Sequence, residues 1–183
     1  MASIILYIAC SLDGYIADDS GSVSWLDAFG DGGDDFGYTD FLQQVGTLLM
    51  GGRTYRQVLE FGEWPYPGKR TVVFTRHPVE GEAPPDVEFR HELTPALLET
   101  LRAGDSRAIW LVGGANLVAQ VIRLQELDSC RIFIMPLVLG SGIPLFEPGL
   151  KLASLQLEQA TPHAQGVVEL RYRCGKQTAG NSG

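Results

Sequence analysis

Two pairs of adjacent glycines, each at the end of an apolar run, are the first features of this sequence that could carry chemistry. The sequence LLMGG ends in Gly51 and Gly52, and IWLVGG ends in Gly113 and Gly114. A helical pattern follows each pair. Glycine lets a ligand approach the backbone closely, and the free N–H groups of a helix N-terminus bind anions. Each pair is therefore a candidate phosphate-binding turn, and a tight turn needed only for packing is the alternative.

Arginine and threonine side chains stand next to these turns. Arg53 and Thr54 follow the first glycine pair, and Thr75 and Arg76 follow a third strand-like run, VVF. Arginine forms forked contacts with phosphate, and threonine adds a hydroxyl donor. A pyrophosphate at one helix N-terminus, with another phosphate between Arg53 and Arg76, describes a phosphorylated dinucleotide. Neither GxGxxG nor the lysine of a P-loop is present, so no single turn is specific by itself.

The distribution of charge supports an anion site. The net charge is −8, which argues against general nucleic-acid binding. Residues 1–50 carry eight aspartates and no lysine or arginine, whereas residues 51–77 carry five basic and two acidic residues. A mostly acidic protein thus has one local basic segment, which contains Arg53 and Arg76. A chance cluster on a solvated surface is the alternative.

A long polar segment follows the first apolar run. The sequence CSLDGYIADDSGSVSW opens a glycine-rich stretch that continues to Gly33. Loops of this length in a compact domain are usually functional lids or disordered segments. Trp25, Leu26 and Phe29 provide apolar anchors, which favours a lid. We expect the DG dipeptide of this segment to form the turn at which the first strand leaves the sheet.

Short apolar runs alternate with helical patterns along most of the chain, which predicts an α/β fold with a mixed, mostly parallel sheet. The early runs are almost wholly apolar, as in strands covered on both faces. The last two alternate between apolar and polar residues and predict a C-terminal antiparallel hairpin at one sheet edge. The predicted strands cover residues 4–10, 47–50, 71–75, 87–90, 108–112, 131–135, 153–160 and 167–174. The predicted helices cover residues 35–45, 54–60, 94–102 and 115–124.

The composition indicates one domain. At 183 residues and 45% apolar composition, we expect a single domain over residues 1–175 with a flexible tail at 176–183. No run is long enough for a membrane helix, and the N-terminus lacks the basic start of a signal peptide. Cys10, Cys130 and Cys174 have no metal-ligand spacing, so we expect no metal site and predict buried, reduced thiols in a cytoplasmic protein.

Five segments, taken in order, resemble those of the dihydrofolate-reductase-like superfamily. They are SLDGYIA, LLMGGRTY, the pair Thr75 and Arg76, LVGGANLV and PLVLGSGIPLF. The branch most similar is the reductase domain of riboflavin biosynthesis, the C-terminal half of bifunctional deaminase-reductases, with its stand-alone relatives. The likeness covers roughly residues 3–173, and LGSGIPLF is its most branch-specific part. It implies a three-layer fold with a mixed eight-stranded sheet, helices on both faces, and NADPH as hydride donor.

The resemblance also implies roles for individual positions. Ala9 and Ile16 would flank the nicotinamide ring of NADPH. The other implied positions are Gly52, Arg53 and Thr54 for phosphate, Thr75 and Arg76 for the adenosine 2′-phosphate, and Gly113, Gly114, Ala115, Asn116 and Leu117 for the pyrophosphate. On this interpretation the glycine pairs are tight turns that build a phosphate cradle.

Asp34 and Asp35 are the candidate catalytic residues. Dihydrofolate reductases place a carboxylate on the helix after the lid, where it contacts the pterin, and these two aspartates lie near that position. Capping of the helix N-terminus by acidic side chains is an alternative of equal weight. The zinc deaminase pattern of the bifunctional enzymes, H-x-E with P-C-x-x-C, is absent from the sequence.

These observations predict an NADPH-dependent reductase of a small pyrimidine- or pterin-type substrate. The leading substrate is 5-amino-6-(5-phosphoribosylamino)uracil of riboflavin biosynthesis, and dihydrofolate is the second. A non-catalytic NADPH-binding protein is the alternative from a different functional class. We expect a homodimer that binds neither nucleic acid nor membranes.

Overall fold

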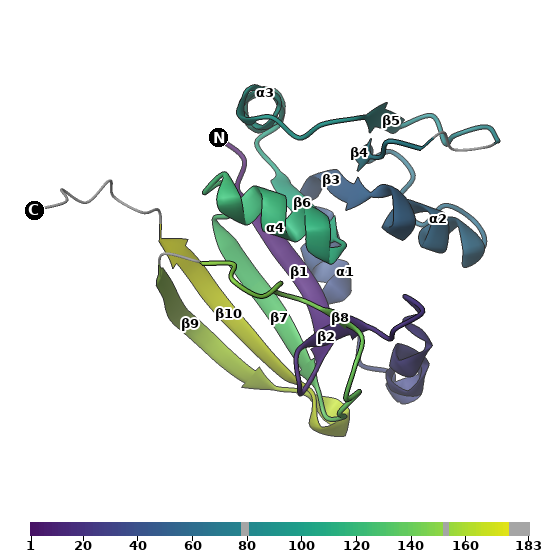
Figure 1. The fold of residues 1–183 in the computed structure, drawn as a ribbon, viewed down its shortest axis with the longest axis vertical. Coiled ribbons are helices and arrows are strands. Elements are labelled where there is room, and N and C mark those ends of the chain that lie inside the picture. Colours follow the sequence, from purple (N-terminus) through teal and green to yellow (C-terminus); the bar gives the residue numbers. More distant parts are fainter. Residues whose placement is uncertain (78–80, 152–153, 176–183) are drawn as a thin grey trace, which may run out of the picture.

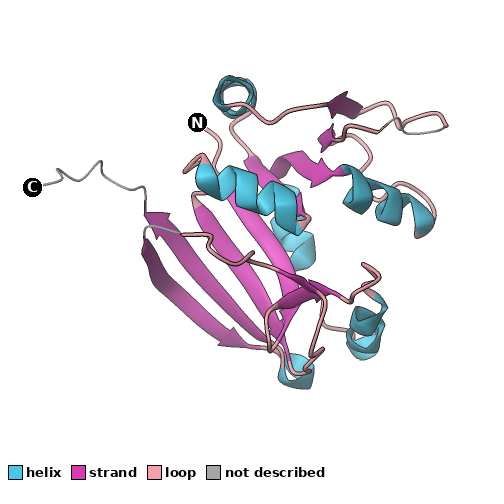
Figure 2. Cartoon of the chain, in the orientation of Figure 1, coloured by secondary structure: helices cyan, strands magenta, loops and turns pink. Residues whose placement is uncertain are grey.

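An eight-stranded sheet forms the centre of the protein (Figures 1 and 2). The computed structural model describes residues 1–77, 81–151 and 154–175. In chain order, the strands of this sheet are β1 (Ile4–Ser11), β3 (Val45–Gly51), β4 (Arg70–Phe74), β5 (Val87–Arg90), β6 (Ala108–Gly113), β7 (Ser129–Met135), β9 (Ser154–Pro162) and β10 (Val168–Gly175). Their order across the sheet is β5-β4-β3-β6-β1-β7-β10-β9.

The first six strands of that order are parallel, and the last two close the sheet as an antiparallel hairpin. β1 pairs in parallel with β6 and β7, and β3 pairs in parallel with β4 and β6. β10 runs antiparallel to both β7 and β9, and the short 3-10 turn η2 (Ala164–Gly166) joins the strands of the hairpin. All eight strands predicted from apolar patterns are confirmed, as is the hairpin at the sheet edge.

Helices cover both faces of the sheet, because the central strands are apolar on both sides. The helices are α1 (Tyr38–Gln44), α2 (Gly52–Glu60), α3 (Pro95–Gly104) and α4 (Ala115–Arg123). Side chains of α3 and α4 pack with Leu6, Leu49 and Leu111 on one face. Side chains of α1 and α2 pack with Leu48 and Trp110 on the other, so neighbouring strand residues belong to different cores. In Figure 1, α4 lies in front of the sheet and α1 behind it.

The four predicted helices are confirmed, with small shifts at their first residues. α1 begins at Tyr38 and not at residue 35, because the Asp35 carboxylate accepts the N–H of Thr39 and so lies before the helix. α2 begins two residues earlier than predicted. α3 begins after Thr94, whose hydroxyl oxygen accepts the N–H of Leu97 as a predicted cap should.

The long segment after β1 is folded onto the sheet. It contains β2 (Tyr15–Ala17) and a 3-10 segment, η1 (Ser24–Gly32), and β2 pairs antiparallel with β8 (Ile143–Pro144). The sequence did not predict this second sheet, because strands of three and two residues are too short to show a period. Trp25, Leu26 and Phe29 pack against buried Phe133 and Met135 of β7, which confirms them as apolar anchors.

The three cysteines are buried and form no disulfide, as predicted. Within the described ranges, no helix is long and apolar enough to cross a membrane. The predicted tail at 176–183 and the first residue of the strand predicted at 153–160 lie outside the described residues.

Candidate functional site

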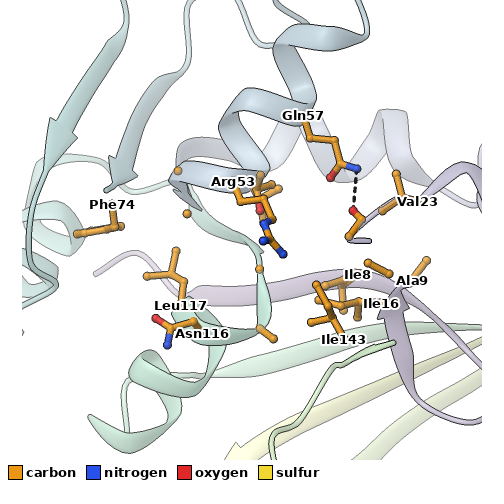
Figure 3. A pocket seen from close by; sticks show the side chains of 18 of the residues that line it. Ile8, Ala9, Ile16, Val23, Arg53, Gln57, Phe74, Asn116, Leu117 and Ile143 are labelled. Carbon is orange, nitrogen blue, oxygen red and sulfur yellow. Dashed lines mark hydrogen bonds between the residues drawn. The ribbon is translucent and has the colours of Figure 1, made fainter. Parts of the chain in front are cut away.

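A cavity of about 470 Å³ opens where β1, β3 and β6 end and α2 and α4 begin (Figure 3). A wider cavity of about 820 Å³ continues from it past the end of β4. The two share Gly52, Arg53, Phe74, Asn116 and Gln120. Ligands of α/β sheets bind beyond the carboxyl ends of the parallel strands. The two cavities therefore form one elongated candidate site at that edge.

The two glycine pairs of the sequence meet in this site. A methyl group built on Gly51 would lie 3.6 Å from the backbone nitrogen of Gly114, so the two turns are in contact. A methyl group on Gly52 would lie only 2.6 Å from Thr75 Oγ1, and Gly113 has a φ of +118°, which side chains disfavour. The fold itself needs those two glycines. A methyl group on Gly114, in contrast, would make only an ordinary contact of 3.6 Å.

The two helices that begin at the cavity lack the side-chain caps of the other helices. Asp35 caps the first turn of α1 and Thr94 that of α3. Among the described residues, no side chain caps the first turn of α2 or α4, and both helices begin at residues that line the cavity, Gly52 and Ala115. Unbonded N–H groups at a helix N-terminus attract anions. These two helix starts are therefore well suited to hold phosphate.

Three arginines of the site have no carboxylate partner in the described part of the chain. Of the eleven arginines in the sequence, eight lie within 4.0 Å of an Asp or Glu oxygen. Among the described residues, Arg53, Arg56 and Arg76 have no such partner, and all three line the wider cavity. An arginine beside a cavity without a carboxylate remains available for an anionic ligand.

The opposite end of the site is apolar. Ile8, Ile16 and Ile143 gather there on one side of Arg53, whereas Asn116 lies on the other side (Figure 3). Apolar walls with few polar groups suit a flat, uncharged ring, whereas phosphate needs the basic end. The site therefore has one end for charge and one for a neutral ring.

Residues 12–33, which follow β1 and are called the lid below after their predicted role, form one wall of this apolar end. Val23 and Leu26 of the lid line the cavity, and the side-chain amide of Gln57 on α2 donates a hydrogen bond to the carbonyl oxygen of Gly21 (3.2 Å; Figure 3). A groove of about 520 Å³ lies between the lid and α2. This groove shares Gln57 and Val23 with the cavity, so the two lie next to each other.

The structure gathers the residues that the sequence predicted to bind NADPH. Those lining the smaller cavity are Ala9, Ile16, Gly52, Arg53, Thr54, Gly114, Ala115, Asn116 and Leu117. Thr75 and Arg76 line the wider cavity, and Gly113 directly precedes the cavity-lining Gly114. Residues from separate strands and helices thus come together at one site, and their binding roles remain predictions.

The two predicted catalytic aspartates have different surroundings. Neither lines the three cavities in the described part of the chain. Hydrogen bonds from the side chain and backbone of Thr39 hold the pKa of Asp35 below the usual aspartate range. Asp34 accepts the N–H of Phe36 and lies 3.7 Å from Nδ1 of His163. The contacts of Asp35 correspond to the capping alternative, whereas those of Asp34 lie outside helix α1, and a catalytic role for either aspartate remains a prediction.

Sequence reasoning missed Arg56, Gln57 and Ile143. Arg56 and Gln57 follow Arg53 by three and four positions on α2, so all three share one helix face. The sequence contained a signal for Arg56 and Gln57, because a helix that starts at Gly52 brings positions three and four residues after Arg53 to the same cavity. Ile143 lies in the LGSGIPLF segment, to which the sequence assigned no role.

A buried ionic cluster joins β7 to β10. Glu169 is 1% exposed, and it accepts hydrogen bonds from Arg131 (2.6 Å) and Arg171 (2.8 Å). Burial by itself raises the pKa of Glu169, but the hydrogen bonds and charges of Arg171 and Arg131 outweigh it and hold the pKa below the usual glutamate range. The Arg131 guanidinium also lies over the Tyr7 ring, 5.0 Å from its centroid. The carboxylate is therefore charged inside the protein at neutral pH.

Known proteins share both the sequence and the fold of this chain. The sequence profile of the RibD C-terminal domain matches residues 64–168. The uncharacterized protein YwjB of Bacillus subtilis (strain 168) is 39% identical over 169 residues, which cover 92% of this chain and 95% of that protein. A solved structure of a protein named for riboflavin biosynthesis, from Shewanella sp. PV-4, has a TM-score of 0.81 and 27% identity, over 94% of this chain and 99% of that one.

A bifunctional protein shares the fold alone. The diaminohydroxyphosphoribosylaminopyrimidine deaminase/5-amino-6-(5-phosphoribosylamino)uracil reductase of Thermotoga maritima has a TM-score of 0.66 at 18% identity, and this chain covers 57% of its length. With the strand order described above, this likeness confirms the predicted dihydrofolate-reductase-like α/β fold. Because the profile matches more than half of its residues and a relative over nearly its full length is 39% identical, the chain belongs to the RibD C-terminal domain family.

Proposed function

We propose that this protein is an NADPH-dependent reductase of a small pyrimidine- or pterin-type heterocycle. One observation carries the proposal: three arginines and two helix N-termini, which have no side-chain partner among the described residues, lie along an elongated cavity that ends in an apolar pocket. Phosphates suit the first part and an uncharged ring suits the second. NADPH has phosphates in its middle and near one end, and an uncharged nicotinamide ring at the other end. It therefore matches both the basic part of the cavity and the apolar pocket.

The residues present fit the parts of NADPH. The starts of α2 and α4 would hold the pyrophosphate, and Gly114 leaves room for it there. Arg76 would hold the adenosine 2′-phosphate, with Arg53 between the two cavities. Ala9 and Ile16 would flank the nicotinamide in the apolar end. When bound, NADPH supplies the hydride for the reduction.

The protein itself would orient the reactants and exclude water. Ile8, Ile16 and Val23 surround the apolar end, and Gln57 holds the lid against α2. An apolar, covered pocket keeps the reacting groups in a fixed arrangement and strengthens nearby electrostatic interactions. The described side chains at this end include no proton donor. We therefore propose that water delivers the proton through the groove beside α2, which Asp27 also lines.

The substrate that we propose first is 5-amino-6-(5-phosphoribosylamino)uracil, the compound in the name of the Thermotoga maritima protein. The membership of this chain in the RibD C-terminal domain family supports it. Since the sequence lacks the deaminase pattern, another protein would supply the deaminated substrate. Dihydrofolate is the second substrate to test.

Cofactor binding is tested by titrating the protein with NADPH and NADH and following fluorescence. NADPH should bind more tightly, and Arg76→Ala should weaken NADPH binding about ten- to a hundredfold while leaving NADH unchanged, because a charged hydrogen bond contributes roughly 1.5–3 kcal/mol. Arg173→Ala, on the distant β10 and paired with Glu158, is the matched control. Equal affinity of the unaltered protein for both cofactors would contradict the assignment of the 2′-phosphate.

Turnover is tested separately, by oxidation of NADPH in the presence of each candidate substrate. A reductase should oxidise one equivalent of NADPH per substrate reduced. Tight NADPH binding without oxidation by either compound would favour the non-catalytic NADPH-binding alternative.

A further inference from the structure

The branch-specific segment LGSGIPLF lies against the start of the lid. Its strand β8 pairs with β2, with Tyr15 opposite Pro144 and Ala17 opposite Ile143. In Figure 1 this two-stranded sheet crosses in front of the lower end of the main sheet. The two segments therefore form one unit although they are far apart in the sequence.

The carboxylate of Asp13 fastens the two segments together. Its Oδ1 accepts the N–H of Leu139 (3.1 Å), and its Oδ2 accepts the N–H of Gly140 (2.7 Å). The hydroxyl of the fully buried Ser11 donates to Asp13 Oδ1 (2.6 Å) and accepts the N–H of Tyr15 (2.9 Å). These hydrogen bonds, that of Ser11 first, hold the pKa of Asp13 below the usual aspartate range. The carboxylate is thus charged at neutral pH and bridges 126 positions of sequence.

The backbones of the two segments are also in close contact. The N–H of Leu145 donates to the carbonyl oxygen of Gly14 (2.9 Å). A methyl group on Gly142 would overlap the carbonyl oxygen of Ala17, so only glycine allows this approach. Gly142 therefore serves the contact with the lid segment.

The unit forms much of the apolar wall of the cavity. Ile16, Ala17 and Ile143 all belong to it, and all three line the cavity with Ala9. Asp13 itself does not line any of the three cavities described above. It can affect a ligand only through the side chains that it holds in place.

We propose that Asp13 is a positioning residue that places the nicotinamide half of the cofactor, by holding the LGSGIPLF segment against the start of the lid. The inference rests on the proposed NADPH site. Thr75 and Arg76, proposed for the 2′-phosphate, lie in the other cavity and outside this unit. Loss of the Asp13 carboxylate should therefore weaken the hold on the nicotinamide half and spare the adenosine half.

Adenosine 2′,5′-bisphosphate separates the two halves, because it carries the 2′-phosphate but no nicotinamide. For Asp13→Asn we expect the Kd for NADPH to rise about tenfold and the Kd for the bisphosphate to change less than about twofold. The increase in NADPH fluorescence on binding should also be smaller in Asp13→Asn than in the unaltered protein. Asp40→Asn is the control, since it removes the same charge from an exposed α1 side chain whose carboxylate has no hydrogen-bond partner among the described residues.

An unchanged NADPH Kd in Asp13→Asn, or an equal loss for both ligands, would overturn the positioning role. If the unaltered protein bound neither ligand, the proposed function would fail instead. Hydrogen exchange of the unaltered protein gives a second measurement that does not depend on the variant folding. NADPH, but not the bisphosphate, should slow exchange at the amides of Tyr15, Leu139 and Gly140. Equal protection by both ligands, or none by either, would contradict the inference.

Discussion

Replacing Gly114 with alanine tests whether the glycine turns cradle a phosphate or serve packing alone. Gly114 has a φ of −79° and a ψ of −164°, which alanine adopts without left-handed strain. Its methyl group would lie 3.6 Å from Thr54 Oγ1, an ordinary contact. Both residues line the cavity, so the methyl group would occupy space that the proposed pyrophosphate needs.

The expected change in the free energy of unfolding is the sum of two small, opposed effects. Alanine reduces the conformational entropy of the unfolded chain, which stabilises by about 0.4–1 kcal/mol. Gly114 is the N-cap residue of α4, where alanine is less favourable than glycine by a similar amount, about 0.5–1 kcal/mol. Since about 1 kcal/mol moves the Tm of a chain of this size by about 2–4 °C, we expect a shift below about 3 °C.

The expected change in NADPH affinity is much larger. Displacing an anion from one backbone N–H removes a charged hydrogen bond of roughly 1.5–3 kcal/mol, so the Kd should rise about ten- to a hundredfold. Calorimetry and fluorescence titration on the same sample give the Tm and the Kd. Gly104→Ala, in open space at the end of α3, should leave the Kd unchanged and at most raise the Tm slightly, whereas Gly113→Ala should also lower the Tm because of the φ of +118°. A folded Gly114→Ala protein with the original NADPH affinity would refute the cradle.

Other predictions concern the ionic cluster, the edge strand and the thiols. Glu169→Gln should cost about 3 kcal/mol of unfolding free energy at pH 7 in urea titrations, because Arg131 and Arg171 lose their carboxylate partner. The native pKa of Glu169 lies below its unfolded value of about 4.3. The stabilisation of the fold by charged Glu169 is therefore present above the unfolded pKa and is lost as the pH falls through the native pKa. The unaltered protein should consequently lose more unfolding free energy in acid than Glu169→Gln does. Parallel losses in the two proteins would contradict this prediction. Leu157→Glu should dissociate the predicted homodimer in sedimentation experiments, since Leu157 is 53% exposed on β9 in the single chain. A variant that stays dimeric would exclude this strand as the interface. The three buried thiols should react with a disulfide reagent only after unfolding, and Cys10, whose pKa burial raises to about 11, should resist the reagent in the folded protein even at about pH 9.

The main sheet could be predicted because its strands are buried on both faces, which makes runs such as residues 108–112 apolar throughout. The hairpin of β9 and β10 could be predicted because only one of its faces is apolar, so its residues alternate. β2 and β8 could not, since strands of three and two residues show no period and their pairing joins distant parts of the chain. A contact over that separation leaves no periodic signal in either segment. The sequence did show both segments as motifs, but not that they touch.

The candidate catalytic residues show a second reason why the sequence alone could not predict the whole site. An acidic residue just before a helix has the same local pattern whether it caps the helix or contacts a substrate. Asp35 could be assigned to α1 only once its bonds to the helix N–H groups were known. The residues predicted to bind the cofactor do line the cavities, because strand ends that are followed by glycine turns meet at one edge of a parallel sheet.

The separation of charge along the chain also constrains how a ligand lies in the site. The first 50 residues carry all their charge as aspartate, and they build the lid and the apolar end, whereas Arg53, Arg56 and Arg76 line the other end. Phosphates are drawn to the arginines and repelled from the lid, so a dinucleotide would enter with its neutral ring toward the apolar end. We expect the phosphate of the proposed substrate to lie nearer to Arg53 and Arg56, the two arginines that line the groove between the lid and α2, than to Asp27, which lines the same groove.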